Sequence, residues 1–439
     1  MSKDMFAFED ELAGTEEKEP LVLSRLVILG FWGSRKVAIE FDKDANFVIG
    51  PNGCGKTTIV NLLAACLSVD FVTIDRIDFS EVSIELSEKN SNRVAARVNV
   101  TKTVQKNLPF PRISYAISDS RTGMNIEVQL DDVEEQLALR DMRYINRRRT
   151  HKSNLFLTEE LRKLCNVTWL SVHRSDAGRE KEERAYDSLV DLKLDHQANA
   201  LVRYFSRLDQ RTAEALRDFQ QTLFLSLLTD DDSDRWFFDY HDYDVDKEKE
   251  ALLAIFEQFN VQKSKYVSRV DRHFGRVKRA IGSDEAMAID VISALVNQKK
   301  IHEIVGEWNK FQAIRRDIYK LRTSFVDCMN RMLLGKEVYI SKANEVSIRA
   351  GGRGLSVKAL SSGEKQLMII LGEALLQEGS PVIYIADEPE LSLHVGWQEM
   401  LVSNIREINS NAQIVFATHS PDIVGSYSDF VIDAKRVIS

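Results

Sequence analysis

The nine residues from Gly50 to Thr58, GPNGCGKTT, have the residue types and the spacing of a phosphate-binding loop. They match G-x-x-x-x-G-K-[ST], a pattern whose glycines let successive backbone N–H groups curl around a phosphate. In this pattern Lys56 reaches the β- and γ-phosphates, and the Thr57 hydroxyl can ligate Mg²⁺. The apolar helix expected over residues 59–67 adds the positive end of its dipole. The sequence therefore predicts a nucleoside triphosphate site, whose binding residues are Asn52, Gly53, Gly55, Lys56, Thr57 and Thr58.

Three further motifs follow in order near the C-terminus: LSSGEKQ at residues 360–366, PVIYIADEPE at 381–390 and FATHSP at 416–421. Taken singly, each has a plain structural interpretation. The first is typical of a helix N-cap, the second of a solvated strand end and the third of a loop histidine. Behind a phosphate-binding loop they are no longer independent coincidences. The candidate residues in them are Ser361, Ser362, Gly363, Glu364, Asp387, Glu388 and His419.

Short apolar or alternating runs predict the strands that must position these residues. We expect strands at residues 21–29, 36–41 and 47–50, a meander over 81–86, 95–104, 112–118 and 125–130, and buried parallel strands at 381–386 and 413–417. No proline occurs between Pro111 and Pro381, and much of that stretch has helical periodicity. The predicted fold is an α/β core in two halves, residues 21–130 and 341–439, split by a mostly helical insertion at 131–340.

Composition favours a globular protein. Of the 439 residues, 44% are apolar and 29% charged, with a net charge of -8, and no apolar run approaches the roughly 20 residues of a membrane-spanning helix. The acidic segment 1–20 lacks the apolar core of a signal peptide, and we expect it to be disordered. The four cysteines have neither zinc-binding nor disulfide spacing. We therefore expect a cytoplasmic protein without a membrane partner.

Together the four motifs resemble the ABC-type ATPase head, a P-loop NTPase, of the SMC, Rad50, RecF and OLD group. The resemblance implies ATP hydrolysis with Mg²⁺ held through Thr57 and Asp387, Glu388 polarising the attacking water and His419 sensing the γ-phosphate. It also implies that Ser361, Ser362, Gly363 and Glu364 form a signature that acts in trans. ATP would then hold two subunits together in a homodimer or higher homo-oligomer. Gln105 and Gln129 both remain candidates for the glutamine loop.

The phrase DEPELSLH, which ends at His394, is similar to ATPases of the OLD type, which carry a nuclease domain. Only nineteen residues follow Ser420, so we expect any nuclease to be a separate protein of the TOPRIM or HNH type. The architecture resembles ATPase subunits of antiphage defence, of the PARIS or Septu type. The leading hypothesis is a regulatory and scaffold ATPase that holds and releases such a nuclease. The alternatives are a RecF- or Rad50-like repair ATPase acting on DNA and, less favoured because of the long insertion, a transporter subunit.

Within the insertion, Lys265, Arg269, Arg272, Arg276 and Arg279 recur at three- and four-residue spacing, which places them on one helix face. That face is either solvated or a contact for DNA or for an acidic protein that imitates DNA. A second basic cluster runs from Arg140 to Lys152, and an aromatic-rich acidic stretch covers 230–246. Residues 169–174, WLSVHR, predict a strand that returns to the core, with Arg174 near either the nucleotide or the dimer seam.

Overall fold

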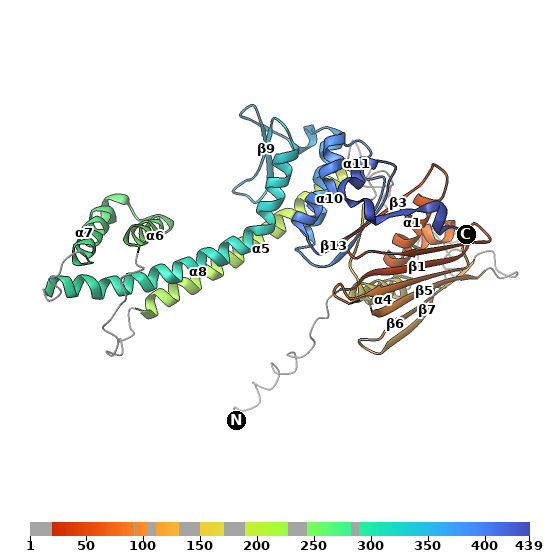
Figure 1. Cartoon of the computed structure of the whole chain (residues 1–439), viewed down its shortest axis with the longest axis horizontal. Coiled ribbons are helices and arrows are strands. Elements are labelled where there is room, and N and C mark those ends of the chain that lie inside the picture. The colour runs from red at the N-terminus through yellow and green to blue at the C-terminus, as the bar shows by residue number, and fades with distance from the viewer. Residues whose placement is uncertain are drawn as a thin grey trace, which may run out of the picture. The chain divides into compact units, whose positions relative to one another are not determined.

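The structure is a computed structural model that describes residues 20–91, 93–103, 111–130, 150–170, 189–226, 244–281 and 289–439. The chain divides into two compact units, which comprise Met1–Val202 with Ser324–Ser439, and Arg203–Thr323 (Figure 1). Several sequence-based predictions lie outside the described residues. These concern the acidic tail, Gln105, the basic cluster before Thr150, Arg174 and the acidic stretch before Asp244.

A five-stranded parallel sheet forms the centre of the first unit, in the order β14-β3-β13-β12-β8. Its strands are β3 (Ala45–Ile49), β8 (Val167–Leu170), β12 (Val382–Asp387), β13 (Ala412–Ala417) and β14 (Val431–Asp433). Strand β3 comes from the N-terminal half and pairs with β13 from the C-terminal half, with Phe47 opposite Phe416. The two halves therefore share one sheet, as the sequence predicts. The strand expected at 169–174 is confirmed in part, because β8 includes residues 169 and 170 and pairs with β12, while 171–174 lie outside the described residues.

A six-stranded antiparallel sheet belongs to the same unit, in the order β2-β1-β4-β5-β6-β7. Its strands are β1 (Val22–Phe31), β2 (Arg35–Glu40), β4 (Glu81–Ser87), β5 (Val94–Thr103), β6 (Arg112–Asp119) and β7 (Met124–Leu130). The predicted meander is confirmed, and buried and partly exposed residues alternate along β4 and β6. Helix α1 (Lys56–Ser68) shares a core with this sheet, and the buried Tyr115 hydroxyl donates to the Cys66 carbonyl over 3.1 Å.

The other elements of the first unit are short helices and a small antiparallel sheet, β11-β10-β9. They are α2 (Phe71–Arg76), α4 (Thr150–Leu164), β9 (Lys336–Ile340), β10 (Val346–Ala350), β11 (Arg353–Leu355), α9 (Ser362–Leu376), α10 (Val395–Ile408), α11 (Pro421–Val424) and α12 (Ala434–Val437).

The second unit is helical. Helix α5 (Leu189–Ser226) begins in the first unit, and helix α8 (Ile289–Met332) ends there. Between them in sequence lie α6 (Val245–Gln258) and α7 (Lys263–Ile281). Within the unit α5 and α8 are antiparallel, because Asp209 accepts a hydrogen bond from Tyr319 over 2.6 Å and Phe219 packs on Trp308 at 5.5 Å. The second unit covers fewer residues than the segment 131–340 expected from the sequence, because α4 and β8 belong to the core of the first unit.

No helix in the described ranges is both long and apolar enough to cross a membrane. All four cysteines are free thiols. Burial raises the pKa of the Cys66 and Cys165 thiols above the usual range, so both stay protonated and inert at neutral pH.

Candidate nucleotide site

The carboxyl ends of three neighbouring parallel strands carry the predicted site. Strand β3 runs into the phosphate-binding loop, β12 ends at Asp387, and β13 is followed by Thr418 and His419. Parallel strands present these ends at one edge, where α/β sheets bind ligands. A cavity of about 320 Å³ opens there, lined by Trp32, Asn52, Gly53, Gly55, Lys56, Thr57, Thr58, Glu388 and His419. The structure thus brings together every residue predicted to bind the nucleotide and both predicted catalytic residues.

Lys56 is almost fully buried, with 4% of its surface exposed. Its ammonium group donates to the Gly50 carbonyl at 2.9 Å and the Pro51 carbonyl at 3.2 Å, and it lies 2.8 Å from Nε2 of His419. Because an ammonium can only donate, Nε2 must accept in this contact and the ring proton must sit on Nδ1. In this structure Lys56 is therefore held by its own loop and by His419.

Thr57 and Asp387 meet at the same edge, with the Thr57 hydroxyl donating to Oδ1 of Asp387 over 2.9 Å. A hydroxyl and a carboxylate are hard oxygen ligands, which suit Mg²⁺. Mg²⁺ usually takes only one or two carboxylates and completes its shell with water and substrate phosphates. The pair fits that ion, and the described ranges hold no group of three or more His, Cys, Asp or Glu side chains suited to a metal.

Glu388 begins the loop after β12 in a left-handed backbone conformation, with φ at 48°. A non-glycine residue in that region costs about 1 kcal/mol or more, and such conformations concentrate at functional sites. Its backbone N–H donates to the Ala417 carbonyl over 2.8 Å, which ties the loop to the neighbouring strand end. Its carboxylate lies 3.4 Å from Nε2 of His419. The strained turn therefore directs the carboxylate into the cavity.

Glu390 is a site residue that sequence reasoning missed. Its Oε1 accepts from the Thr418 hydroxyl at 2.5 Å and from the His419 backbone N–H at 3.1 Å. The side chain is buried, and its Oε2 has no hydrogen-bond partner among the described residues. Glu390 thus fixes the backbone of His419 from the loop that also carries Glu388. The sequence DEPE at residues 387–390 shows that a glutamate is present, but it does not predict its contact with Thr418 and His419.

Trp32 is the second missed residue. It follows β1 in a left-handed turn, with φ at 52°, and stacks on the buried Phe31 at 4.7 Å. The Arg35 guanidinium lies 5.7 Å from its ring centre. The ring remains 42% exposed at the cavity, and a Cβ on Gly55 would lie 3.0 Å from it. A rigid, half-exposed indole beside a phosphate-binding loop is suited to stacking on a nucleotide base.

Replacing Trp32 by alanine is expected to raise KM for ATP about 10-fold with little change in kcat, because aromatic stacking on a base contributes about 1–3 kcal/mol. Steady-state phosphate release measures both constants. Trp32→Phe is the matched control and should keep most of the affinity. Equal KM values for wild type and Trp32→Ala would show that the ring does not contact the base.

The predicted signature forms the start of α9. Ser361 is the N-cap residue and makes a capping box with Glu364, whose carboxylate also pairs with Lys336 at 2.6 Å. Burial acts to raise the pKa of Glu364, but the hydrogen bonds from Lys336 and Ser361 outweigh it and lower the pKa overall. Glu364 therefore stays ionised as a structural brace. The exposed Ser362 is left to face solvent.

Gly363 packs the signature turn against the segment that follows Glu388. A Cβ at this position would lie 2.3 Å from the Ser392 carbonyl oxygen. Gln366, which is buried, donates to the Pro389 carbonyl over 2.8 Å. The predicted signature turn and the loop that carries Glu388 are thus packed together. Residues 361–364 are nevertheless not among those that line the candidate nucleotide cavity in the described ranges.

Replacing Gly363 by alanine is expected to lower the free energy of unfolding by about 1–3 kcal/mol, because the backbone cannot yield to the added methyl group. ATP hydrolysis should fall because the methyl group disturbs the segment that carries Glu388. ATP binding should persist, because the atoms that the methyl group would meet belong to Ser392 and Trp397 and not to the phosphate-binding loop. Gly306→Ala in α8 is the matched control, because its Cβ would meet nothing within 4 Å. Thermal unfolding and a nucleotide-binding titration measure these effects. An unchanged Tm for Gly363→Ala would contradict the packing.

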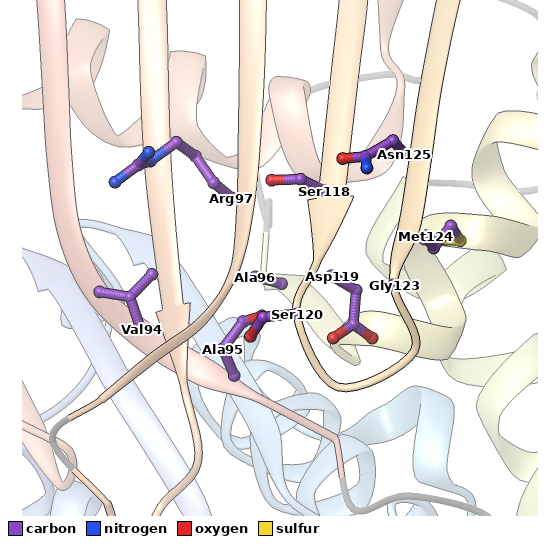
Figure 2. A pocket seen from close by; sticks show the side chains of 10 residues that line it. All are labelled: Val94, Ala95, Ala96, Arg97, Ser118, Asp119, Ser120, Gly123, Met124 and Asn125. Carbon is purple, nitrogen blue, oxygen red and sulfur yellow. The ribbon is translucent and has the colours of Figure 1, made fainter.

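A second hollow, of about 370 Å³, lies at the ends of β5, β6 and β7 (Figure 2). Asp119 is buried beside it and is already paired with Arg121 at 3.2 Å. The hollow has no phosphate-binding loop, and its buried charge is satisfied. The cavity at the parallel sheet is therefore the better candidate for the nucleotide site.

The remaining predicted residues lie elsewhere. His394 is exposed and caps α10, where its Nδ1 accepts from the Gly396 backbone N–H over 3.2 Å. Gln129 is exposed on β7 opposite Ser114 and does not line the cavity, so the glutamine loop stays unassigned. The five cations of the insertion lie on α7, in the second unit.

The sequence profile of the AAA ATPase domain family, AAA_15, matches residues 22–424. The chain is 21% identical over 397 residues to the probable ATPase of retron Vc95 from Vibrio cholerae serotype O1 biovar El Tor. The match covers 87% of this chain and 66% of that protein, so the chain spans just under two thirds of the relative's length.

Two solved structures with loose similarity are Smc head domains. The head from Pyrococcus furiosus, bound to the C-terminal domain of ScpA, is 12% identical with a TM-score of 0.37, covering 92% of this chain and 91% of that chain. The head from Pyrococcus yayanosii is 16% identical with a TM-score of 0.38, covering 92% and 93%.

Proposed function

This chain belongs to the AAA ATPase domain family and is an ATPase, and we propose that it is the ATP-controlled regulatory and scaffold subunit of a cytoplasmic antiphage defence complex. In this proposal the subunit holds a separate nuclease of the TOPRIM or HNH type and releases it when ATP is hydrolysed. The similarity to a retron ATPase supports a role of this kind. We further propose that the defence complex is of the PARIS or Septu type.

One observation carries the oligomeric part of the proposal. The signature turn exposes Ser362 on the surface, outside the nucleotide cavity of its own chain. A second copy can bring its own Ser361–Glu364 turn to this cavity and complete the site around the γ-phosphate. Gly363 and Gln366 join that turn to the loop of Glu388, so closure of the dimer and the positioning of the catalytic loop are mechanically linked.

The site residues suggest how hydrolysis proceeds. The phosphate oxygens attract the Lys56 ammonium away from His419. Once Lys56 has moved away, His419 can exchange through solvent to the tautomer with its proton on Nε2, which donates a hydrogen bond to a γ-phosphate oxygen. The Glu388 carboxylate accepts a hydrogen bond from the attacking water and orients it. Thr57 and Asp387 would hold Mg²⁺, which would supply neutralisation of the phosphate charge. Positioning and charge neutralisation carry most of such a reaction.

A tagged pull-down from the native host tests the proposal. The wild-type chain and the Glu388→Gln chain would each be captured with ATP, with ADP and without nucleotide, and the complexes weighed and their proteins identified. We expect the Glu388→Gln chain with ATP to contain at least two copies of itself and a stoichiometric nuclease. A monomer under all conditions would contradict the composite site. A dimer with DNA and no protein partner would favour the RecF- or Rad50-like repair function instead.

A further inference from the structure

Helix α7 carries a charge that contrasts with the rest of the chain. Its nineteen residues hold seven lysines and arginines and one aspartate, whereas the whole chain has a net charge of -8. Its apolar side is packed: Tyr266, Val270 and Phe274 are buried in a cluster that includes Leu252 and Phe256 of α6. The helix therefore has one fixed face in the unit and one face left for contacts.

Five cations occupy that outer face, at positions 265, 269, 272, 276 and 279, and all five are exposed. No carboxylate in the described ranges lies within ion-pair distance of them; the Arg279 side chain donates to the Gly275 carbonyl over 3.1 Å. We name this set the α7 stripe. Neighbouring charges behave differently, since Lys278 pairs with Asp246 at 2.7 Å and Asp271 with Lys249 at 2.6 Å. Lys278 and Asp271 are thus neutralised by partners within the unit, whereas the cations of the α7 stripe have no carboxylate partner in the described ranges.

We propose that the α7 stripe binds the phosphate backbone of double-stranded DNA. Residues 265–279 span about 21 Å along the helix axis, which matches roughly six base pairs of duplex. Four of the five cations are arginines, whose guanidinium groups bind phosphate oxygens in pairs. The B-form major groove admits an α-helix, whereas the major groove of duplex RNA is too narrow.

Other polyanions fit the face less well. Single-stranded nucleic acid is usually held by aromatic side chains on which the bases stack. Between the cations of this face, Ser268 is exposed and Gly275 is partly exposed, and neither is aromatic. A DNA contact here goes beyond the proposed scaffold role, because it gives the second unit a ligand of its own that does not depend on ATP.

The test uses the full chain and a fluorescently labelled 25-base-pair duplex, with binding followed by anisotropy between 50 and 200 mM salt. Arg269, Arg272 and Arg276 would be replaced together by glutamine, which preserves the helix. We expect this variant to bind at least 10-fold more weakly and to flatten the slope of log affinity against log salt by roughly 2.7, for three lost phosphate contacts. Replacing the same three residues by lysine should retain most of the binding, because the charge is kept.

The matched control replaces Lys247, Lys263 and Lys310 by glutamine. It makes the same change in net charge within the unit, but each of these lysines is paired with a carboxylate outside α7. It should bind DNA as the wild type does. The proposal fails if the wild type does not bind the duplex, if the glutamine variant binds equally well, or if single-stranded DNA, duplex RNA or polyglutamate binds more tightly than duplex DNA.

Discussion

Replacement of Glu388 by glutamine is expected to lower kcat for ATP hydrolysis by about 10²–10³-fold, which corresponds to roughly 2.7–4 kcal/mol of activation free energy. The carboxylate lies at the cavity, 3.4 Å from His419, on a strained loop that fixes its direction. Glutamine has the same shape but cannot accept from the attacking water with a charged oxygen. Loss of a positioned acid–base group typically costs this much.

ATP affinity should stay the same or increase in Glu388→Gln, because a negative charge near the triphosphate is removed. The protein should then accumulate as an ATP-bound dimer. Steady-state phosphate release, nucleotide titration and mass measurement in solution check the three expectations. Glu399→Gln, an exposed glutamate of α10, is the matched control and should hydrolyse ATP normally. Wild-type turnover in Glu388→Gln would remove this residue from the mechanism.

The parts of this fold that were predictable share one property, which is that the local pattern and the tertiary environment agree. Strand β12 is apolar up to its last residue, Asp387, and β13 is apolar apart from Gln413, as expected for buried parallel strands. The backbone of a phosphate-binding loop requires glycine at fixed positions, so the motif can be recognised from local sequence alone. Lys56, Asp387 and His419 each follow a predicted parallel strand, so their convergence was also predictable, while their roles in catalysis remain predictions.

The parts that were missed depend on contacts between distant segments. Trp32 falls between the strands expected at residues 21–29 and 36–41, and only the left-handed turn after β1 places its ring beside Gly55. Glu390 reads as one more acid in an acidic phrase, and its role depends on Thr418 from the next strand. Local sequence carries no signal for either contact.

The helical insertion shows the same limit on a larger scale. Its helical character is evident from composition, but the antiparallel pairing of α5 and α8 rests on contacts such as Phe219 with Trp308, far apart in sequence. The expected segment 131–340 is longer than the second unit, because α4 and β8 precede that unit in sequence and pack in the core of the first unit. Packing across the fold, not propensity, decides both.

The second large effect is expected from Lys56→Ala, which should weaken ATP binding at least about 100-fold, or roughly 2.7 kcal/mol. The ammonium is the only cation that lines the cavity in the described ranges, and charge-assisted hydrogen bonds to phosphate are among the stronger contacts in proteins. Without the ammonium, the Gly50 and Pro51 carbonyls also lose their donor. A nucleotide titration by calorimetry measures the loss.

Lys56→Ala can also lower stability, because it empties a site that is 4% exposed and leaves carbonyl groups unpaired. Lys56→Met separates the two effects, since it keeps the aliphatic length and removes only the charge. We expect Lys56→Met to unfold closer to the wild-type Tm and still to bind ATP at least about 100-fold more weakly. If Lys56→Met binds ATP with wild-type affinity, the lysine serves the loop and His419 and not the phosphates. The two variants together therefore distinguish a phosphate ligand from an internal brace of the loop.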